Sequence, residues 1–156
     1  MLRKLIPALG TAAALVATAA LAHHGWSSFD ETRPIYLEGV VKQVKWQNPH
    51  AEVMLEVNGA AAPAAISRFA VPRQSASVDA VTILGTAKPP TRKDKVWEIE
   101  FAPITRMDAW KVTAPKVGDK LAVVGYTFKD EKGEPTLRVE FIVGNGKVTP
   151  LRSSPV

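Results

Sequence analysis

The three histidines of the chain lie in two short motifs. His23 and His24 stand together in HHGWSSFD (residues 23–30), and His50 ends WQNPH (residues 46–50). Imidazole is the commonest side-chain ligand of late transition metals, and the sequence has no cysteine that would supply a thiolate instead. A metal site would therefore be built from histidine, amine, carboxylate or thioether groups. We take His23, His24 and His50 as its candidate ligands.

Residues 1–22 have the pattern of an export signal. Arg3 and Lys4 precede an apolar run that ends in small residues, and the segment has no acidic residue. The run contains Pro7 and Gly10 and is shorter than the roughly 20 residues of a membrane-spanning helix. We therefore expect export to the periplasm, or out of the cell, with no stable membrane anchor after cleavage.

The site of cleavage decides which chelate the new N-terminus makes. Both Ala20 and Ala22 end a small-x-small pattern. Cleavage after Ala22 makes His23 the first residue, so that its amine and ring chelate one metal and His50 or His24 adds a third nitrogen. This set resembles the histidine brace of copper proteins. Cleavage after Ala20 puts His23 third, which resembles the amino-terminal copper and nickel motif. Both frames suit Cu(II), which favours tetragonal nitrogen and oxygen ligands.

Three further side chains are candidates for weaker roles. Glu52 and Met54 share the parity of His50 and so point to one face of a strand. Met54 would be a soft axial donor, and Glu52 would orient an imidazole ring. Asp30, in the first motif, is a third candidate. The alternatives are that Met54 fills the core and that Glu52 is a solvated surface residue.

Most of the chain after residue 34 alternates between apolar and polar residues, which is typical of β-strands. Gly39 predicts a bulge or a sharp bend in the first strand. The order strand, strand, strand, short helix, strand, strand suits an OB-like five-stranded barrel, with another small all-β barrel as the alternative. We expect long strands at 35–46, 50–57, 96–101, 120–128 and 135–143, a short helix at 103–111, and a short strand at 66–71. The segment 72–90 reads as a long excursion with room for one more short strand around 81–84.

Composition fits one globular domain over residues 23–156. The chain has 156 residues, 46% apolar, and a formal charge of +5. Removing 22 residues with Arg3 and Lys4 leaves 134 residues and a charge of +3, which is only mildly basic. Scattered charges and export both argue against a nucleic-acid partner. The absence of cysteine excludes disulfides, thiol catalysis and cysteine-ligated zinc.

No catalytic constellation stands out in the sequence. There is no HExxH motif and no glycine-rich phosphate loop. Ser27, Ser28 and Asp30 lie too close to His24 in the sequence to assemble an activated triad on one short segment. A copper brace can host oxidative chemistry, but we do not expect an enzyme.

Four motifs together resemble a known family. They are HHGWSSFD, WQNPH, RMDAW (residues 106–110) and GYTFKD (residues 125–130). This set is similar to a family of small exported bacterial proteins filed as domain of unknown function 6152. The resemblance extends over nearly all of residues 23–155 and implies a secreted β domain. It lends no activity and no assigned ligands.

Two functions therefore remain open. In the first, the domain binds copper, or another transition metal, through its processed N-terminus and serves copper handling or sensing in the envelope. In the second, it is a metal-free interaction module that contacts a partner protein or a glycan with an aromatic face. That face would include Trp26, Phe29 and Trp46, of which Trp26 and Phe29 would also pin the N-terminus to the barrel.

Overall fold

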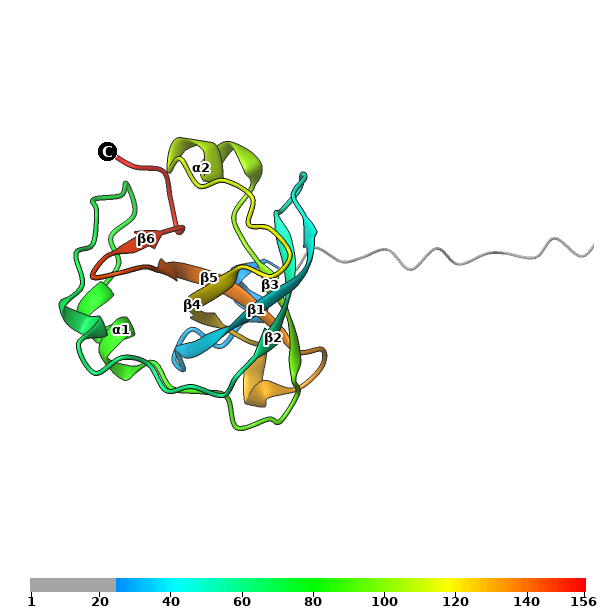
Figure 1. Cartoon of the computed structure of the whole chain (residues 1–156). Helices are drawn as coiled ribbons and strands as arrows, with labels where there is room; N and C mark the ends of the chain where they lie inside the picture. Colours follow the sequence, from blue (N-terminus) through cyan, green and yellow to red (C-terminus); the bar gives the residue numbers. More distant parts are fainter. Residues whose placement is uncertain (1–24) are drawn as a thin grey trace, which may run out of the picture.

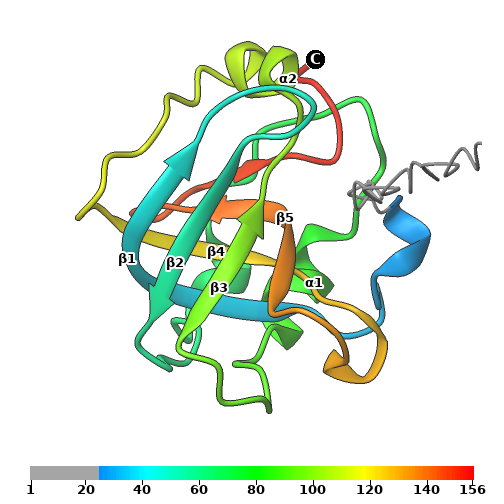
Figure 2. The same ribbon diagram turned by 90° about the vertical axis from the view of Figure 1, so that its right-hand side faces the viewer.

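Five strands close into a barrel in the computed structural model of the chain, which describes residues 25–156. β1 pairs with β2 and β4, β2 with β3, and β4 with β5, all antiparallel, and a parallel pairing of β3 with β5 closes the ring. One short helix, α2 (Ile104–Ala109), lies between β3 and β4 in the chain. This is the predicted OB-like arrangement (Figures 1 and 2). The strands are β1 (Ile35–Lys45), β2 (Glu52–Val57), β3 (Val96–Glu100), β4 (Lys120–Tyr126) and β5 (Thr136–Val143).

Alternate residues of the strands fill the barrel. Because successive side chains point to opposite faces of a strand, one parity of each strand is buried inside. Met107 of α2 joins this interior core. The other parity of β2 and β3 faces outward and carries most of the polar side chains discussed below. Interior residues of the strands include Leu37, Val41, Val53, Leu55, Trp97, Ile99, Val123, Leu137 and Val139.

Gly39 lies where β1 approaches its neighbour closely, whereas the irregularity in the β1–β2 register falls between Val41 and Gln43. Gly39 pairs with Val57 of β2 on one side and with Leu121 of β4 on the other. A side chain at Gly39 would overlap the carbonyl oxygen of Glu56. The first half of β1 pairs with β4 and the second half with β2, so one strand serves two neighbours, as strand closure in a small barrel requires.

A second core lies outside the barrel. Tyr36, Val124 and Phe141 point outward from β1, β4 and β5, and they pack against Leu84 and Val148 from the segments that follow β2 and β5. These segments contain a 3₁₀ turn, η2 (Ile66–Arg68), a helix, α1 (Ala80–Thr86), and a sixth strand, β6 (Val148–Pro150), which pairs with β5. Part of the segment 72–90 therefore covers the outside of the barrel (Figure 1).

Two of the expected short strands are absent, and β6 was not expected. Residues 66–68 form η2, Ala70 makes an isolated bridge with Lys147, and residues 81–84 lie inside α1. Asp79 caps α1 by accepting a hydrogen bond from the Thr82 backbone N–H at 3.1 Å, and Leu84 is buried. No helix within residues 25–156 is long and apolar enough to cross a membrane. The expected export signal (1–22), His23 and His24 lie outside the described residues.

Candidate functional site

His50 lies in the connection between β1 and β2, and its imidazole meets a carboxylate of the neighbouring strand. His50 Nδ1 is 3.1 Å from Glu100 Oε1, at the end of β3. The two side chains are 14% and 10% exposed, so the contact is largely shielded from solvent. Burial raises the pKa of Glu100, Arg138 opposes that rise, and the carboxylates of Glu52 and Glu98 add to it.

The strand register aligns four charged residues across the outer surface of the barrel. Lys45 of β1 is opposite Glu52 of β2, Glu52 is opposite Glu100 of β3, and Glu100 is opposite Arg138 of β5. Lys45 Nζ lies 2.9 Å from Glu52 Oε2, and Arg138 Nη1 lies 3.2 Å from Glu100 Oε1. Glu52 is thus engaged by a lysine, whereas Glu100 holds the His50 ring. We call these four residues the charged row.

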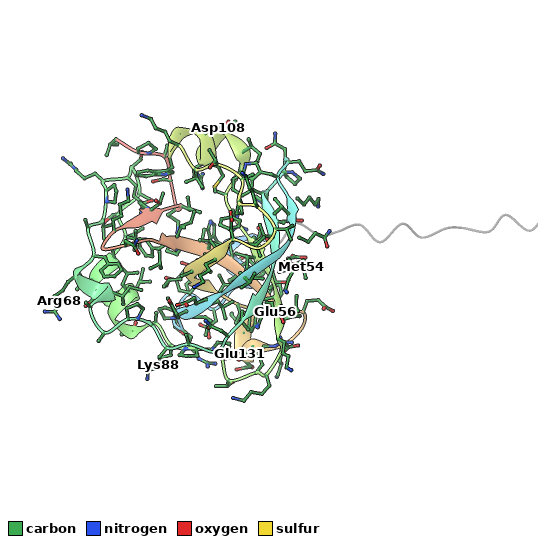
Figure 3. All side chains as sticks on the ribbon, viewed as in Figure 1. Met54, Glu56, Arg68, Lys88, Asp108 and Glu131 are labelled. Carbon is green, nitrogen blue, oxygen red and sulfur yellow. The ribbon has the colours of Figure 1, made fainter. Side chains whose placement is uncertain are left out.

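Met54 lies one position further along the same surface. It pairs with Gln43 of β1 and with Glu98 of β3. Its neighbours in sequence, Val53 and Leu55, are buried inside the barrel, so the half-buried Met54 faces outward and is not an interior core residue. Figure 3 shows Met54 and Glu56 on this outer side of β2. The shared face of Glu52 and Met54 is as the parity of the sequence indicates.

The first described residues are packed onto the barrel by two aromatic rings. Trp26 opens a 3₁₀ turn, η1 (Trp26–Ser28), and its ring centroid lies 4.6 Å from the Arg138 guanidinium carbon. Phe29 is buried and stacks on Phe128, with ring centroids 4.9 Å apart. The N-terminal segment therefore runs beside the charged row.

A second cluster of ion pairs lies beside the same Trp26 ring. The Arg152 guanidinium carbon is 3.7 Å from the Trp26 centroid, and Arg152 Nη2 is 2.6 Å from Glu140 Oε2 and 2.9 Å from Glu31 Oε2. Glu140 is completely buried, and its Oε1 accepts no hydrogen bond within the described part of the chain. Burial raises the pKa of Glu140, and the hydrogen bond from Arg152 opposes the rise.

Two candidates from the sequence are engaged in local structure. Asp30 Oδ1 accepts a hydrogen bond from the Thr32 backbone N–H at 3.1 Å, and hydrogen bonds from Thr32 lower the pKa of Asp30. Trp46 is partly buried and packs on Phe101, with ring centroids 5.6 Å apart. Phe29 is only 3% exposed, so it adds nothing to an exposed aromatic face.

The structure brings together one predicted ligand and a partner that the sequence did not reveal. His50 is the only one of the three histidines among the described residues, and no group of three His, Asp or Glu side chains within residues 25–156 is arranged to hold a metal. Glu100 was missed because its contact with His50 depends on the β2–β3 register. The alternation of apolar and polar residues over 96–101 puts Glu100 on the face of the strand that points away from the core. This alternation was the signal from which its outward position could have been predicted.

Comparison with known proteins gives a match to one family model and no activity. No curated protein and no solved structure matches the chain. Residues 12–80 match a family model, and that segment contains both HHGWSSFD and WQNPH, whereas RMDAW and GYTFKD lie beyond it. The matching model is that of DUF6152, a family of unknown function.

Proposed function

We propose that this protein is an exported domain that binds a transition metal, copper above all, between its processed N-terminus and His50. The observation that carries the proposal is the contact between His50 Nδ1 and Glu100. A carboxylate on one imidazole nitrogen fixes the orientation of the ring and raises the basicity of the other nitrogen, which is the usual arrangement behind a metal-bound histidine. Nε2 is then the atom through which His50 would bind the metal.

The position of Trp26 supports the participation of the N-terminus. Trp26 contacts Arg138, and Arg138 pairs with the carboxylate that holds His50. Consecutive Cα atoms are about 3.8 Å apart, and His23 and His24 are within three residues of Trp26. In the proposed site, an amine and two imidazoles would supply three nitrogen ligands to Cu(II).

Met54 extends the chemistry that the same surface offers. Its thioether is on the outer face of β2, one position beyond Glu52 on the side away from His50. Thioethers are soft ligands that favour Cu(I), whereas amines and imidazoles favour Cu(II). The surface therefore offers donors for both oxidation states, which suits a role in copper handling or sensing in the envelope.

The proposal is tested by the thermal stability of protein that begins at His23. A ligand that binds only the native state raises the melting temperature, so Cu(II) is expected to raise the Tm of the wild type. His50→Ala and His23→Ala should each abolish the increase. Glu56→Gln is the matched control, because Glu56 is on the same face of β2 but pairs with Lys42, and it should keep the increase. An unchanged Tm in the wild type, or an equal increase in His50→Ala, would overturn the proposal.

The metal-free interaction module has less support. Of the three aromatic residues proposed for an exposed face, Phe29 is buried, Trp26 packs on two arginines and Trp46 packs on Phe101. These contacts tie the rings to the barrel instead of presenting them together to a partner.

A further inference from the structure

Trp26 contacts two guanidinium groups. The centroid of its ring lies 4.6 Å from the Arg138 guanidinium carbon and 3.7 Å from that of Arg152, and Tyr126 meets it edge-on at 6.4 Å. Cation–π contacts of this kind are strongest where the cation is shielded from water. The side chains of Arg138 and Arg152 are only 11% and 22% exposed. The ring is therefore fixed from the barrel side by two partly buried charges.

This arrangement is a poor way to gain stability alone. Removing charges from water costs several kcal/mol for each ion, and well-packed apolar residues of similar volume often stabilise a protein equally well. The carboxylates that pair with the two arginines, Glu100 and Glu140, are 10% and 0% exposed. Directional ion pairs at such a cost are better explained by the geometry that they impose on Trp26.

The two arginines differ in the carboxylates with which they pair. Arg138 pairs with Glu100, and Glu100 contacts His50 Nδ1. Arg152 pairs instead with Glu140 and Glu31. A continuous series of contacts thus runs from Trp26 through Arg138 and Glu100 to His50, and Arg152 stands outside it.

We infer that Arg138 is a positioning residue that couples the N-terminal segment to His50, fixing the segment through Trp26 and the imidazole through Glu100. The inference rests on the proposed function for its purpose, since the two parts that Arg138 joins are the two parts of the proposed copper site. The coupling itself exists without metal and can be measured without it.

The test compares Arg138→Lys with Arg152→Lys. Each variant keeps the positive charge beside its carboxylate and loses the planar guanidinium over Trp26. In metal-free protein that begins at His23, Arg138→Lys is expected to shift the imidazole NMR signals of His50, whereas Arg152→Lys leaves them unchanged. Trp26→Ala should shift them in the same direction as Arg138→Lys, because Trp26 is connected to His50 through Arg138 and Glu100. Equal signals in wild type and Arg138→Lys, or equal shifts in the two lysine variants, would overturn the inference.

A second measurement uses Cu(II) at a temperature where all variants are folded. Replacing a residue behind a metal ligand typically costs 10–100-fold in affinity. We expect Arg138→Lys to lose at least roughly tenfold and to change the Cu(II) electron paramagnetic resonance spectrum. Arg152→Lys should keep the wild-type spectrum, and a merely structural role of Arg138 would lower the Tm and leave the spectrum unchanged. If the wild type binds no Cu(II), the proposed function fails, and the metal-free signals of His50 still decide the role of Arg138.

Discussion

Two buried glutamates of the barrel have pKa values shifted in opposite directions. Glu140 is completely buried, and burial raises its pKa although Arg152 opposes the rise. Burial alone would also raise the pKa of Glu131, but hydrogen bonds from the backbone N–H groups of Thr91 and Arg92 outweigh it and lower the pKa. Glu131, labelled in Figure 3, thereby anchors the loop before β3 to the turn between β4 and β5.

These shifts predict opposite effects of pH on stability. A raised pKa means that the folded protein binds the Glu140 proton more tightly, so the free energy of unfolding falls as pH rises from the ordinary value of 4.5 to the folded value. Glu140→Gln removes that fall, and its stability relative to wild type should increase across this window.

Glu131 stabilises the fold above its ordinary pKa and loses this effect as pH falls through the folded value, so Glu131→Gln should be most damaging near neutral pH. Urea unfolding between about pH 4 and pH 7 measures both, and parallel curves for wild type and Glu140→Gln would contradict the first expectation.

At the scale of single residues, the sequence predicts which side chains share a face of a strand but not which atoms come into contact. The parity of residues 50–57 correctly places Glu52 and Met54 on one face of β2. The partner of His50 is nevertheless Glu100, which the register sets opposite Glu52. A strand paired one residue out of step would exchange the faces of all its side chains. Local sequence does not define that register, and so it does not reveal the contact.

At the scale of elements, the clearest discrepancy is α1. Its sequence contains Val81, Thr82 and Ile83, which are β-branched and favour strands. The helix forms because Asp79 caps it and because Leu84 and Ile83 pack on the outer core. Tertiary packing and one cap thus override local propensity, and neither is visible in a short apolar run.

The outer core predicts a large effect at Leu84, in a stretch that the sequence suggests is a long excursion with room for a short strand. Leu84→Ala should lower the free energy of unfolding by about 2–5 kcal/mol, because it leaves a cavity at a fully buried site. Val81→Ala is the matched control in the same helix, since Val81 is 65% exposed, and it should change stability by no more than about 0.5 kcal/mol. Chemical denaturation of both variants measures the difference. Similar small effects in the two variants would contradict the packing of α1 on the barrel.

At the scale of the whole molecule, the barrel follows from the order of its elements. Five alternating segments with one helix after the third predict the closed arrangement, and β1 to β5 form where the alternation is strongest. The outer layer was not predicted because η2, α1 and β6 are short and contribute only a few residues each to the outer core. Their apolar residues are spread over turn-rich segments that share no period. Only the finished barrel provides the surface on which they meet.

In the proposed copper site, the first residue after cleavage would decide whether the barrel takes part in binding. If the chain begins at His23, its amine and ring leave room for His50, and the Glu100–His50 pair contributes to the site. If it begins at Leu21, the amine, two backbone nitrogens and the His23 ring can fill the four positions that Cu(II) prefers. His50 is then not needed.

We predict that the exported protein begins at His23, which the intact mass of secreted material determines directly. Two recombinant proteins, beginning at His23 and at Leu21, separate the chemistry from the cleavage. His50→Ala should abolish the Cu(II)-dependent increase in Tm in the first protein and leave Cu(II) binding intact in the second, because only the first uses a ligand from the barrel. Adding one glycine before His23 should weaken binding in the first protein, since it separates the amine from the ring. If His50→Ala has the same effect in both frames, the N-terminal amine and His50 do not share a metal.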